Sequence, residues 1–153
     1  VLQVKTSVEK AISQVKPLAA IKNIAITSLG DGTVYVWADD IMLNTVLRNL
    51  ISNAIKFSYP DSEITISHQI HDSHVIISVK DNGVGIRKEV LDGLFFVDST
   101  SSTQGTAGEA GTGFGLPLCY QLVKMQNGQI WVESDVGQGS TFFIKLPLNA
   151  KSL

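Results

Sequence analysis

Hydrophobic positions along the first third of the chain follow helical spacing, then strand spacing, then helical spacing again. Apolar spacing predicts a helix from Val1 to about Lys16, which we expect Pro17 to end because proline removes a backbone donor and clashes with the preceding turn. The runs IAITS and TVYVWA predict two short strands around the turn LGDG. A second helix is expected to begin after Asp39, whose side chain can cap it, and to run to about Phe57.

The remainder of the chain predicts two strand pairs separated by helical pieces. EITISHQI and SHVIISVK alternate β-branched and polar residues and predict a hairpin. A short helix is expected over residues 88–93, and FGLPLCYQLVKMQ predicts a longer one, with Pro117 tolerated in its first turn. GQIWVES and STFFIKLP predict a closing hairpin, whereas residues 98–113 show no period. These elements predict an α+β fold, a two-layer α/β sandwich whose mixed sheet is covered by helices on one face.

Composition limits the domain count and the partners. A chain of 153 residues fits one domain over residues 1–153, burying roughly 68–70% of its unfolded surface. The net charge of -2 offers no bulk attraction to nucleic acid or to an anionic membrane. No apolar run approaches the ~20 residues of a membrane span. The single cysteine, Cys119, favours a reducing, cytoplasmic location. The helical start without an initiator Met indicates a piece of a longer protein.

The helix predicted over residues 40–57 has two distinct faces. Asparagine is a poor helix former, and a merely solvated face usually carries Glu, Lys or Gln instead. An amide oxygen can bind Mg²⁺ once phosphates supply charge, and a lysine one turn further can contact those phosphates. A solvated face and a binding site both remain open from this helix alone. The expected core arc is Leu43, Leu47, Leu50, Ile51, Ala54 and Ile55, and the opposite polar arc is Thr45, Asn49, Asn53 and Lys56.

Two glycine clusters elsewhere in the chain give a second indication of a binding site. DNGVGI follows a predicted strand, and GTGFGL opens a predicted helix, so that backbone N–H groups and the positive end of the dipole can meet an anion there. Turns or hinges are the plain alternative for any one glycine. The second cluster lacks the lysine of a Walker loop, and Leu116 stands where a dinucleotide fingerprint needs glycine. The clusters therefore indicate a phosphate site of another kind.

These segments together resemble the catalytic ATP-binding domain of sensor histidine kinases. NLISNAIKFS resembles the N box, DNGVGI the first glycine box, LFF the F box and GTGFGL the second glycine box, and WVESDVGQGSTFFIKLP resembles the closing hairpin. That domain belongs to a superfamily shared with gyrase, heat-shock chaperone and mismatch-repair ATPases. The resemblance covers residues 1 to 148 and implies a Bergerat-type ATP-binding fold with a flexible ATP lid over residues 98–110.

The resemblance also implies roles for individual residues. Asn53 would be the Mg²⁺ ligand with Asn49 in support, Lys56 would contact phosphate, and Asp81 would accept the adenine amino hydrogen. A hydrogen bond to a charged group contributes about 1.5–3 kcal/mol, or roughly 10–150-fold in affinity. Asn49 and Lys56 are thus the expected catalytic residues. The expected ATP-binding residues are Asn53, Phe57, Asp81, Gly83, Gly85, Ile86, Gly111, Thr112, Gly113, Phe114, Gly115, Leu116 and Thr141.

Asn49 favours transfer of the γ-phosphate of ATP to a protein over hydrolysis of ATP. Relatives that hydrolyse ATP carry a glutamate there as general base, and an amide cannot take that proton. The resemblance implies a phosphoaccepting histidine on a separate dimerisation domain preceding Val1, a response regulator as next partner, and a homodimeric parent protein. His68, His71 and His74 are expected to be solvated residues around a hairpin turn rather than acceptors.

One departure from the family pattern leaves two alternatives open. Phe96 stands where many relatives carry an arginine, and residues 92–115 contain no Lys or Arg. Lys56, with Arg87 and Lys88 as further cations, would then carry the positive charge at the phosphates. The alternatives are a nucleotide-binding regulatory module with little transfer activity and an anti-sigma-type serine kinase.

Overall fold

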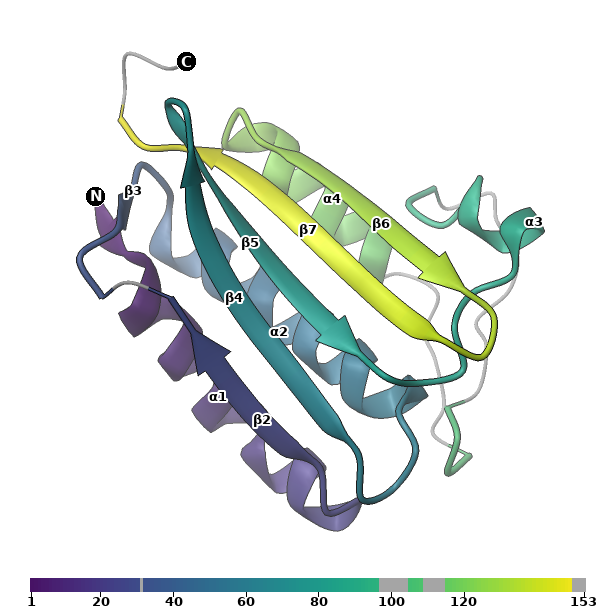
Figure 1. Cartoon of the computed structure of the whole chain (residues 1–153). Coiled ribbons are helices and arrows are strands. Elements are labelled where there is room, and N and C mark those ends of the chain that lie inside the picture. The colour runs from purple at the N-terminus through teal and green to yellow at the C-terminus, as the bar shows by residue number, and fades with distance from the viewer. Residues whose placement is uncertain (31, 97–104, 109–114, 150–153) are drawn as a thin grey trace.

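The computed structural model describes residues 1–30, 32–96, 105–108 and 115–149. Its elements form two layers, one of strands and one of helices (Figure 1). The strands are β1 (Leu2–Gln3), β2 (Ala25–Leu29), β3 (Tyr35–Val36), β4 (Glu63–His71), β5 (His74–Asp81), β6 (Gln129–Asp135) and β7 (Gly139–Pro147). The helices are α1 (Val4–Ile21), α2 (Asp40–Phe57), α3 (Lys88–Leu91) and α4 (Gly115–Met125).

The main sheet has five strands in the order β2-β4-β5-β7-β6. The β2–β4 pair is parallel, and the other three pairs are antiparallel. Helices α1, α2 and α4 lie behind the sheet in Figure 1, so they cover one face and leave the other open. The predicted mixed sheet with helices on one face is therefore confirmed, and most of its strand pairs are antiparallel. Strand β5 is central, which places its last residue, Asp81, in the middle of one sheet end.

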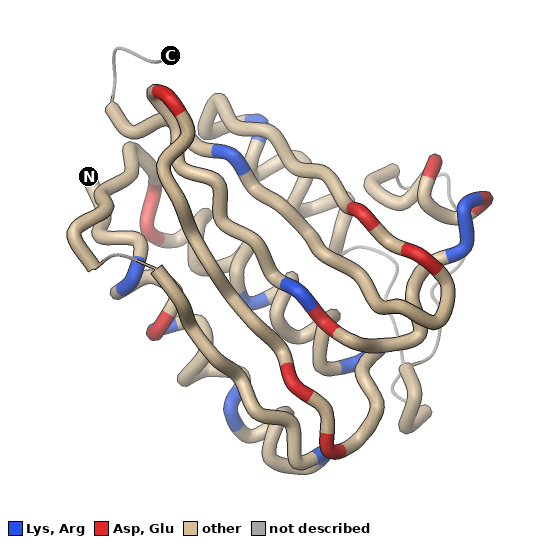
Figure 2. The backbone as a smooth tube through the Cα atoms, viewed as in Figure 1, with Lys and Arg blue, Asp and Glu red and all other residues tan. Residues whose placement is uncertain are grey.

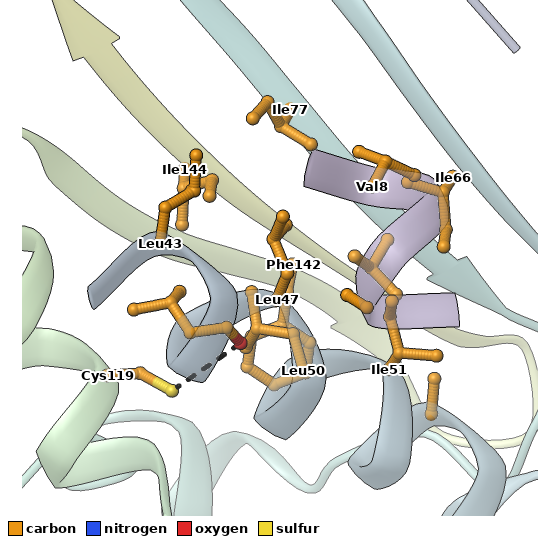
Figure 3. Packing of buried hydrophobic residues seen from close by; sticks show 14 of the residues in the cluster. Val8, Leu43, Leu47, Leu50, Ile51, Ile66, Ile77, Cys119, Phe142 and Ile144 are labelled. Carbon is orange, nitrogen blue, oxygen red and sulfur yellow. Dashed lines mark hydrogen bonds between the residues drawn. The ribbon is translucent and has the colours of Figure 1, made fainter. Parts of the chain in front are cut away.

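The core lies between the sheet and the helices. Alternation along β5 buries Val75, Ile77 and Val79 and turns the residues between them to the open face. All six residues of the predicted α2 arc are buried, as expected. Figure 3 shows four of them, Leu43, Leu47, Leu50 and Ile51, on the side of α2 that faces the sheet. The polar residues of α2 are therefore held on a helix whose rotation is fixed by its apolar face.

Helix α1 differs from the prediction at both ends. It begins at Val4, after a short strand, and continues through Pro17 to Ile21. Pro17 is exposed, so water can reach the carbonyl that loses its helical partner, while Val15 and Ala19 keep the apolar stripe in the core. Burial of this stripe outweighs the local cost of the proline.

The two short strands around LGDG do not pair with each other. Strand β3 pairs with β1, which falls in the segment predicted as helix, and β2 joins the main sheet beside β4. The expected strand at Thr33–Ala38 is reduced to Tyr35–Val36. The pairing of β2 is set by docking onto the core rather than by the turn.

The prediction for His68 is wrong. The β4–β5 turn falls at Asp72 and Ser73, so alternation along β4 places His68 on the core face with Ile64 and Ile66. It is only 7% exposed. A Cβ at Gly30 would lie 2.4 Å from the His68 ring, so glycine allows that loop to cover the imidazole. His71 is exposed, as expected.

Charged residues of both signs are interspersed along the backbone of the described part (Figure 2). None of the helices in the described ranges combines the length and the apolar character that crossing a bilayer requires.

Candidate functional site

The polar face of α2 presents two amide side chains. Asp39 caps the helix by accepting from Met42 N–H at 2.9 Å, which confirms its predicted role. Asn49 Nδ2 donates to Thr45 O at 2.9 Å, and this bond directs Oδ1 away from the helix backbone. Asn53, one turn further and half-buried, makes no side-chain hydrogen bond to the residues that the structure describes. Both amide oxygens are therefore available as acceptors or metal ligands.

Packing of α4 against α2 brings Gly115, a residue of the second glycine box, close to Asn49. A Cβ placed on Gly115, the first residue of α4, would lie 3.6 Å from Asn49 Oδ1. The next residue, Leu116, packs against the core. The expected ligands Gly111, Thr112, Gly113 and Phe114 lie outside the described residues. The N box and the start of α4 thus meet in the fold, as the family resemblance implies.

Lys56 and Phe57 occupy the last turn of α2. Lys56 Nζ lies 4.9 Å from the centroid of the Phe57 ring, within cation–π distance. This positions the ammonium at the carbonyl end of α2, on the helix face that also carries Asn49 and Asn53.

Asp81 ends β5 with its carboxylate on the core side. The residue is 4% exposed, and Oδ1 accepts from Gly83 N–H at 2.8 Å and from Ser140 N–H at 3.3 Å. Burial raises the pKa of the carboxyl, and these two backbone donors partly oppose the rise. Because both bonds end on Oδ1, Oδ2 is left as an acceptor for a ligand N–H.

The two glycines after Asp81 are required by contacts within the protein. A Cβ on Gly83 would lie 2.1 Å from Phe57 O, and one on Gly85, whose φ is +72°, would lie 2.1 Å from Asp135 O. Val84 N–H donates to Phe57 O at 3.2 Å. The glycines therefore bring the Asp81 loop against the end of α2 and the end of β6. The family resemblance implies nucleotide contacts for both glycines, and their packing role depends on contacts that the motif does not reveal.

Serine residues of the closing hairpin complete the surroundings of Asp81. Ile86 N–H donates to Ser134 Oγ at 2.8 Å, and Ser134 Oγ lies 2.7 Å from Ser140 Oγ. Thr141 pairs with Lys80 and points to the opposite face of the sheet from Asp81. Ser140, missed in the sequence, is the neighbour of Asp81. Counting alternation back from buried Phe142 would have found it.

The F-box segment packs against α4 through aromatic rings. Phe95 lies 6.2 Å from Tyr120 and 6.3 Å from Phe142 between ring centroids, and Phe96 lies 5.5 Å from Tyr120. Arg87 and Lys88, at the start of α3, are exposed. Phe96 is thus placed on α4 as an aromatic contact, where many relatives are expected to have a cation.

The donor set of the site suits Mg²⁺ better than a metal held by the protein alone. Among the described residues, no group of three or more His, Cys, Asp or Glu is arranged to hold a metal ion. Asn49 Oδ1 and Asn53 offer neutral oxygens, and Mg²⁺ is usually bound by few protein oxygens together with substrate phosphates and water. The residues present therefore fit Mg²⁺ when a polyphosphate supplies the charge.

Comparisons of this chain with family models, with curated proteins and with solved structures agree on one family. Residues 38–150 match the family described as histidine kinase-, DNA gyrase B-, and HSP90-like ATPase. The sensor protein SrrB of Staphylococcus aureus is 39% identical over 117 residues, which are 73% of this chain and 19% of SrrB. The nucleotide-free catalytic domain of histidine kinase ThkA has a TM-score of 0.84 at 23% identity, covering 99% of this chain and 97% of that domain. Histidine kinase ThkA in complex with response regulator protein TrrA gives a TM-score of 0.80 at 21% identity, covering 99% of this chain and 42% of that one.

These matches agree with the geometry around α2. The family match includes the helix with Asn49 and Asn53, the Asp81 loop and α4, and the fold of the whole described chain is that of a solved histidine kinase catalytic domain. Family membership implies ATP as the nucleotide. The resemblance drawn from the N box and glycine boxes is confirmed: the chain belongs to the family of histidine kinase-, DNA gyrase B- and HSP90-like ATPases.

Proposed function

We propose that this domain binds Mg-ATP and transfers the γ-phosphate to a histidine on a separate phosphoacceptor domain. The observation that supports it is the convergence of Asn49, the start of α4 and the Asp81 loop on the C-terminal half of α2. Asn49 Oδ1 faces Gly115, and the Phe57 carbonyl binds Val84 N–H. Phosphoryl transfer depends mainly on positioning and charge stabilisation, which such a convergence supplies.

Asp81 recognises the base in this proposal. Oδ2 accepts the adenine amino hydrogen, while Oδ1 is held by Gly83 and Ser140. The carboxylate would repel the carbonyl oxygen of guanine, so the site discriminates between the two purines. Ser140 and the half-buried Ile86 border this end of the site.

The phosphates lie toward α4 and Lys56. Lys56 contributes a positive charge from the last turn of α2, and the N-terminal end of α4 contributes backbone N–H donors. Asn53, supported by Asn49, would hold Mg²⁺, which supplies charge stabilisation at the phosphates when bound. Because Asn49 cannot take a proton from water, we infer transfer to a protein acceptor rather than rapid hydrolysis.

The partners follow from this chemistry. We propose a histidine-containing dimerisation domain as phosphate acceptor, a response regulator receiver domain as the next carrier, and a homodimeric parent protein. The complex of ThkA with TrrA supports the second of these. ATP as the nucleotide and a free, buried thiol at Cys119 favour the cytoplasm. Phe96 on Tyr120, in place of a cation, favours the regulatory module with slow transfer as the second candidate.

Titration of the 153-residue chain with ATP, with and without Mg²⁺, tests the proposal. We expect Mg²⁺ to tighten ATP binding, and Asn53→Ala to abolish that gain. Asn44→Ala is the matched control, since Asn44 lies on the opposite side of α2 and its buried Nδ2 has no hydrogen bond to a described residue. If wild-type protein binds no ATP, the proposal fails. If Asn53→Ala retains the full Mg²⁺ effect, the metal lies elsewhere.

A further inference from the structure

Lys22, just after α1, is a buried lysine outside the residues assigned to ATP. It is 6% exposed, and a lysine buried to this extent needs polar partners for its charge and its donors. Its ammonium donates to Ile55 O at 2.9 Å, Lys56 O at 3.1 Å and Thr106 Oγ1 at 2.6 Å. Three N–H donors are thus matched by oxygens from two segments that are distant in sequence.

The carbonyl groups that Lys22 binds belong to the last turn of α2. The last carbonyls of a helix lack i+4 partners and carry the partial negative charge of the helix end, which favours a cation. Here Ile55 O also accepts from Ser58 N–H at 3.3 Å. Phe57, the last residue of the same turn, has its carbonyl bound by Val84 N–H. Lys22 therefore completes the hydrogen bonding of the turn that presents Lys56 and Phe57.

Thr106 is bound to the same helix end. Its N–H donates to Lys56 O at 3.0 Å, and its hydroxyl donates to Ser58 O at 2.6 Å while it accepts from Lys22. Lys22 and Thr106 share the Lys56 carbonyl, and the hydroxyl joins the ammonium to Ser58. This four-residue network of Lys22, Lys56, Ser58 and Thr106 is called the α2-end bridge below.

The backbone of Lys22 is itself fixed. Asp61 N–H donates to Lys22 O at 2.9 Å, and Asn23 Nδ2 donates to Asp61 Oδ1 at 2.8 Å. Lys22 N–H donates to Ala19 O at 3.2 Å. The backbone of Lys22 is therefore fixed by hydrogen bonds at its N–H and at its carbonyl. From this fixed backbone the ammonium can hold Thr106 in place.

We propose that Lys22 is a positioning residue for the phosphate end of the site. Through the α2-end bridge it holds the chain at Thr106 against the last turn of α2, beside Lys56, and so fixes that chain relative to the nucleotide phosphates. This rests on the ATP binding proposed above. A lysine that only capped α2 would need the Ile55 and Lys56 carbonyls alone, whereas the bonds to Thr106 connect the cap to the site.

The first measurement needs no nucleotide. Amide hydrogen exchange at Thr106 is followed by NMR in Lys22→Met, which removes the ammonium, and in Thr106→Val, which removes only the hydroxyl. We expect exchange about tenfold faster in both, as for loss of one hydrogen bond near 1.5 kcal/mol. Thr106→Ser keeps the hydroxyl and should exchange as wild type. Lys16→Met is the control, because Lys16 is an exposed lysine of α1.

The second measurement compares ATP with AMP binding in the same variants. We expect ATP affinity to fall about fivefold or more in Lys22→Met and Thr106→Val while AMP affinity stays within about twofold, since only the phosphate end is displaced. The double variant should bind ATP no more weakly than the weaker single variant. Thr106→Ser and Lys16→Met should bind both nucleotides as wild type does.

The outcomes separate this proposal from the proposed function. Lower melting temperatures with unchanged Thr106 exchange and an unchanged ratio of ATP to AMP affinity would make Lys22 a helix cap only and overturn the proposal. If Lys22→Met does not fold, Thr106→Val decides alone. Absence of ATP binding in the wild type is a failure of the proposed function, whereas wild-type binding with an unchanged ratio is a failure of this inference.

Discussion

At the scale of single residues, Asp81 shows how binding chemistry and stability oppose each other. Its carboxylate lies at 4% exposure, where burial disfavours the ionised form. The two N–H donors on Oδ1 reduce that cost, and Oδ2 is the atom left for a ligand. The position therefore offers an acceptor oxygen for recognition, and ionising this buried carboxyl lowers the free energy of unfolding.

The pH dependence of Asp81 follows from this. Because its folded pKa lies above the ordinary 3.8, the folded chain holds more protons at Asp81 between the two values than the unfolded chain does. The contribution of Asp81 to stability is therefore fully present below 3.8 and is lost as pH rises through the folded pKa. Asp81→Asn removes that loss, and we expect the variant to be at least as stable as wild type at pH 7 in urea unfolding.

The same substitution should weaken ATP binding by about tenfold or more, because an amide N–H would face the adenine amino group in place of Oδ2. Calorimetric titration measures this, and affinity in the wild type should decline as Asp81 is protonated. An unchanged dissociation constant in Asp81→Asn would contradict the adenine assignment. Melting curves of the same samples show whether the fold is intact.

Many residues of the candidate site could be predicted, because each belongs to a short motif that is continuous in the sequence. Asp81 at a strand end and the two asparagines on one helix face required only periodicity. The prediction of a solvated His68 is wrong, because the face that a strand residue occupies depends on where the turn falls. Thr141 lies on the opposite face of the sheet from Asp81, which motif spacing does not reveal. The positions of Ser140 and Lys22 depend on contacts between distant segments, which spacing does not reveal.

At the scale of elements, the end of α2 organises the candidate site. Lys22, Val84 and Thr106 all bind carbonyls of its last residues or of Ser58, so three separate segments use one helix terminus. The helix itself was predictable from its cap and its apolar arc. Continuation of α1 through Pro17 and pairing of β3 with β1 were not, because tertiary packing decided them against local preference.

Gly83→Ala tests the contact between the Asp81 loop and α2. The added methyl would meet the Phe57 carbonyl at 2.1 Å, a backbone atom in a helix end that cannot move freely. We expect a loss of about 1–3 kcal/mol in the free energy of unfolding, as for overpacking, together with weaker ATP binding.

Gly32→Ala is the matched control for that variant. Its added methyl would meet only the flexible Lys5 side chain at 3.4 Å, so stability should change little. Equal urea midpoints for Gly83→Ala and wild type would show that the loop does not rest on α2 as described.

At the scale of the whole molecule, the residues that form the core and the residues of the candidate site lie in different places. The sheet and the apolar faces of α1, α2 and α4 form the core, while the polar face of α2 and the loops at one end of β5 form the candidate site. The layer arrangement could be predicted from element order, since one-sided strands and amphipathic helices must cover each other.

The chain alone should bind ATP without labelling itself. Supplied with its own dimeric phosphoacceptor domain, it should label a histidine there slowly, because a missing tether lowers effective concentration from the mM range of short linkers. Labelling with γ-³²P-ATP measures this, and Phe96→Arg should raise the rate by adding a cation near the phosphates.

The chemical stability of the product distinguishes the alternatives. An acid-labile label on the acceptor supports histidine transfer, whereas an acid-stable label supports the serine kinase. Tight ATP binding without transfer would favour the regulatory module, and rapid labelling of His68, His71 or His74 in the isolated chain would contradict the assignment altogether.

The parallel pairing of β2 with β4 has a consequence for how the molecule folds. Parallel neighbours cannot be joined by a tight turn, and here the connection between them contains α2. We therefore expect β2 to pair with β4 after α2 has docked, since this pairing is non-local and non-local contacts slow folding. A ligand that binds only the folded chain stabilises it, so we expect ATP bound at the proposed site on α2 to slow amide hydrogen exchange in β2 as well.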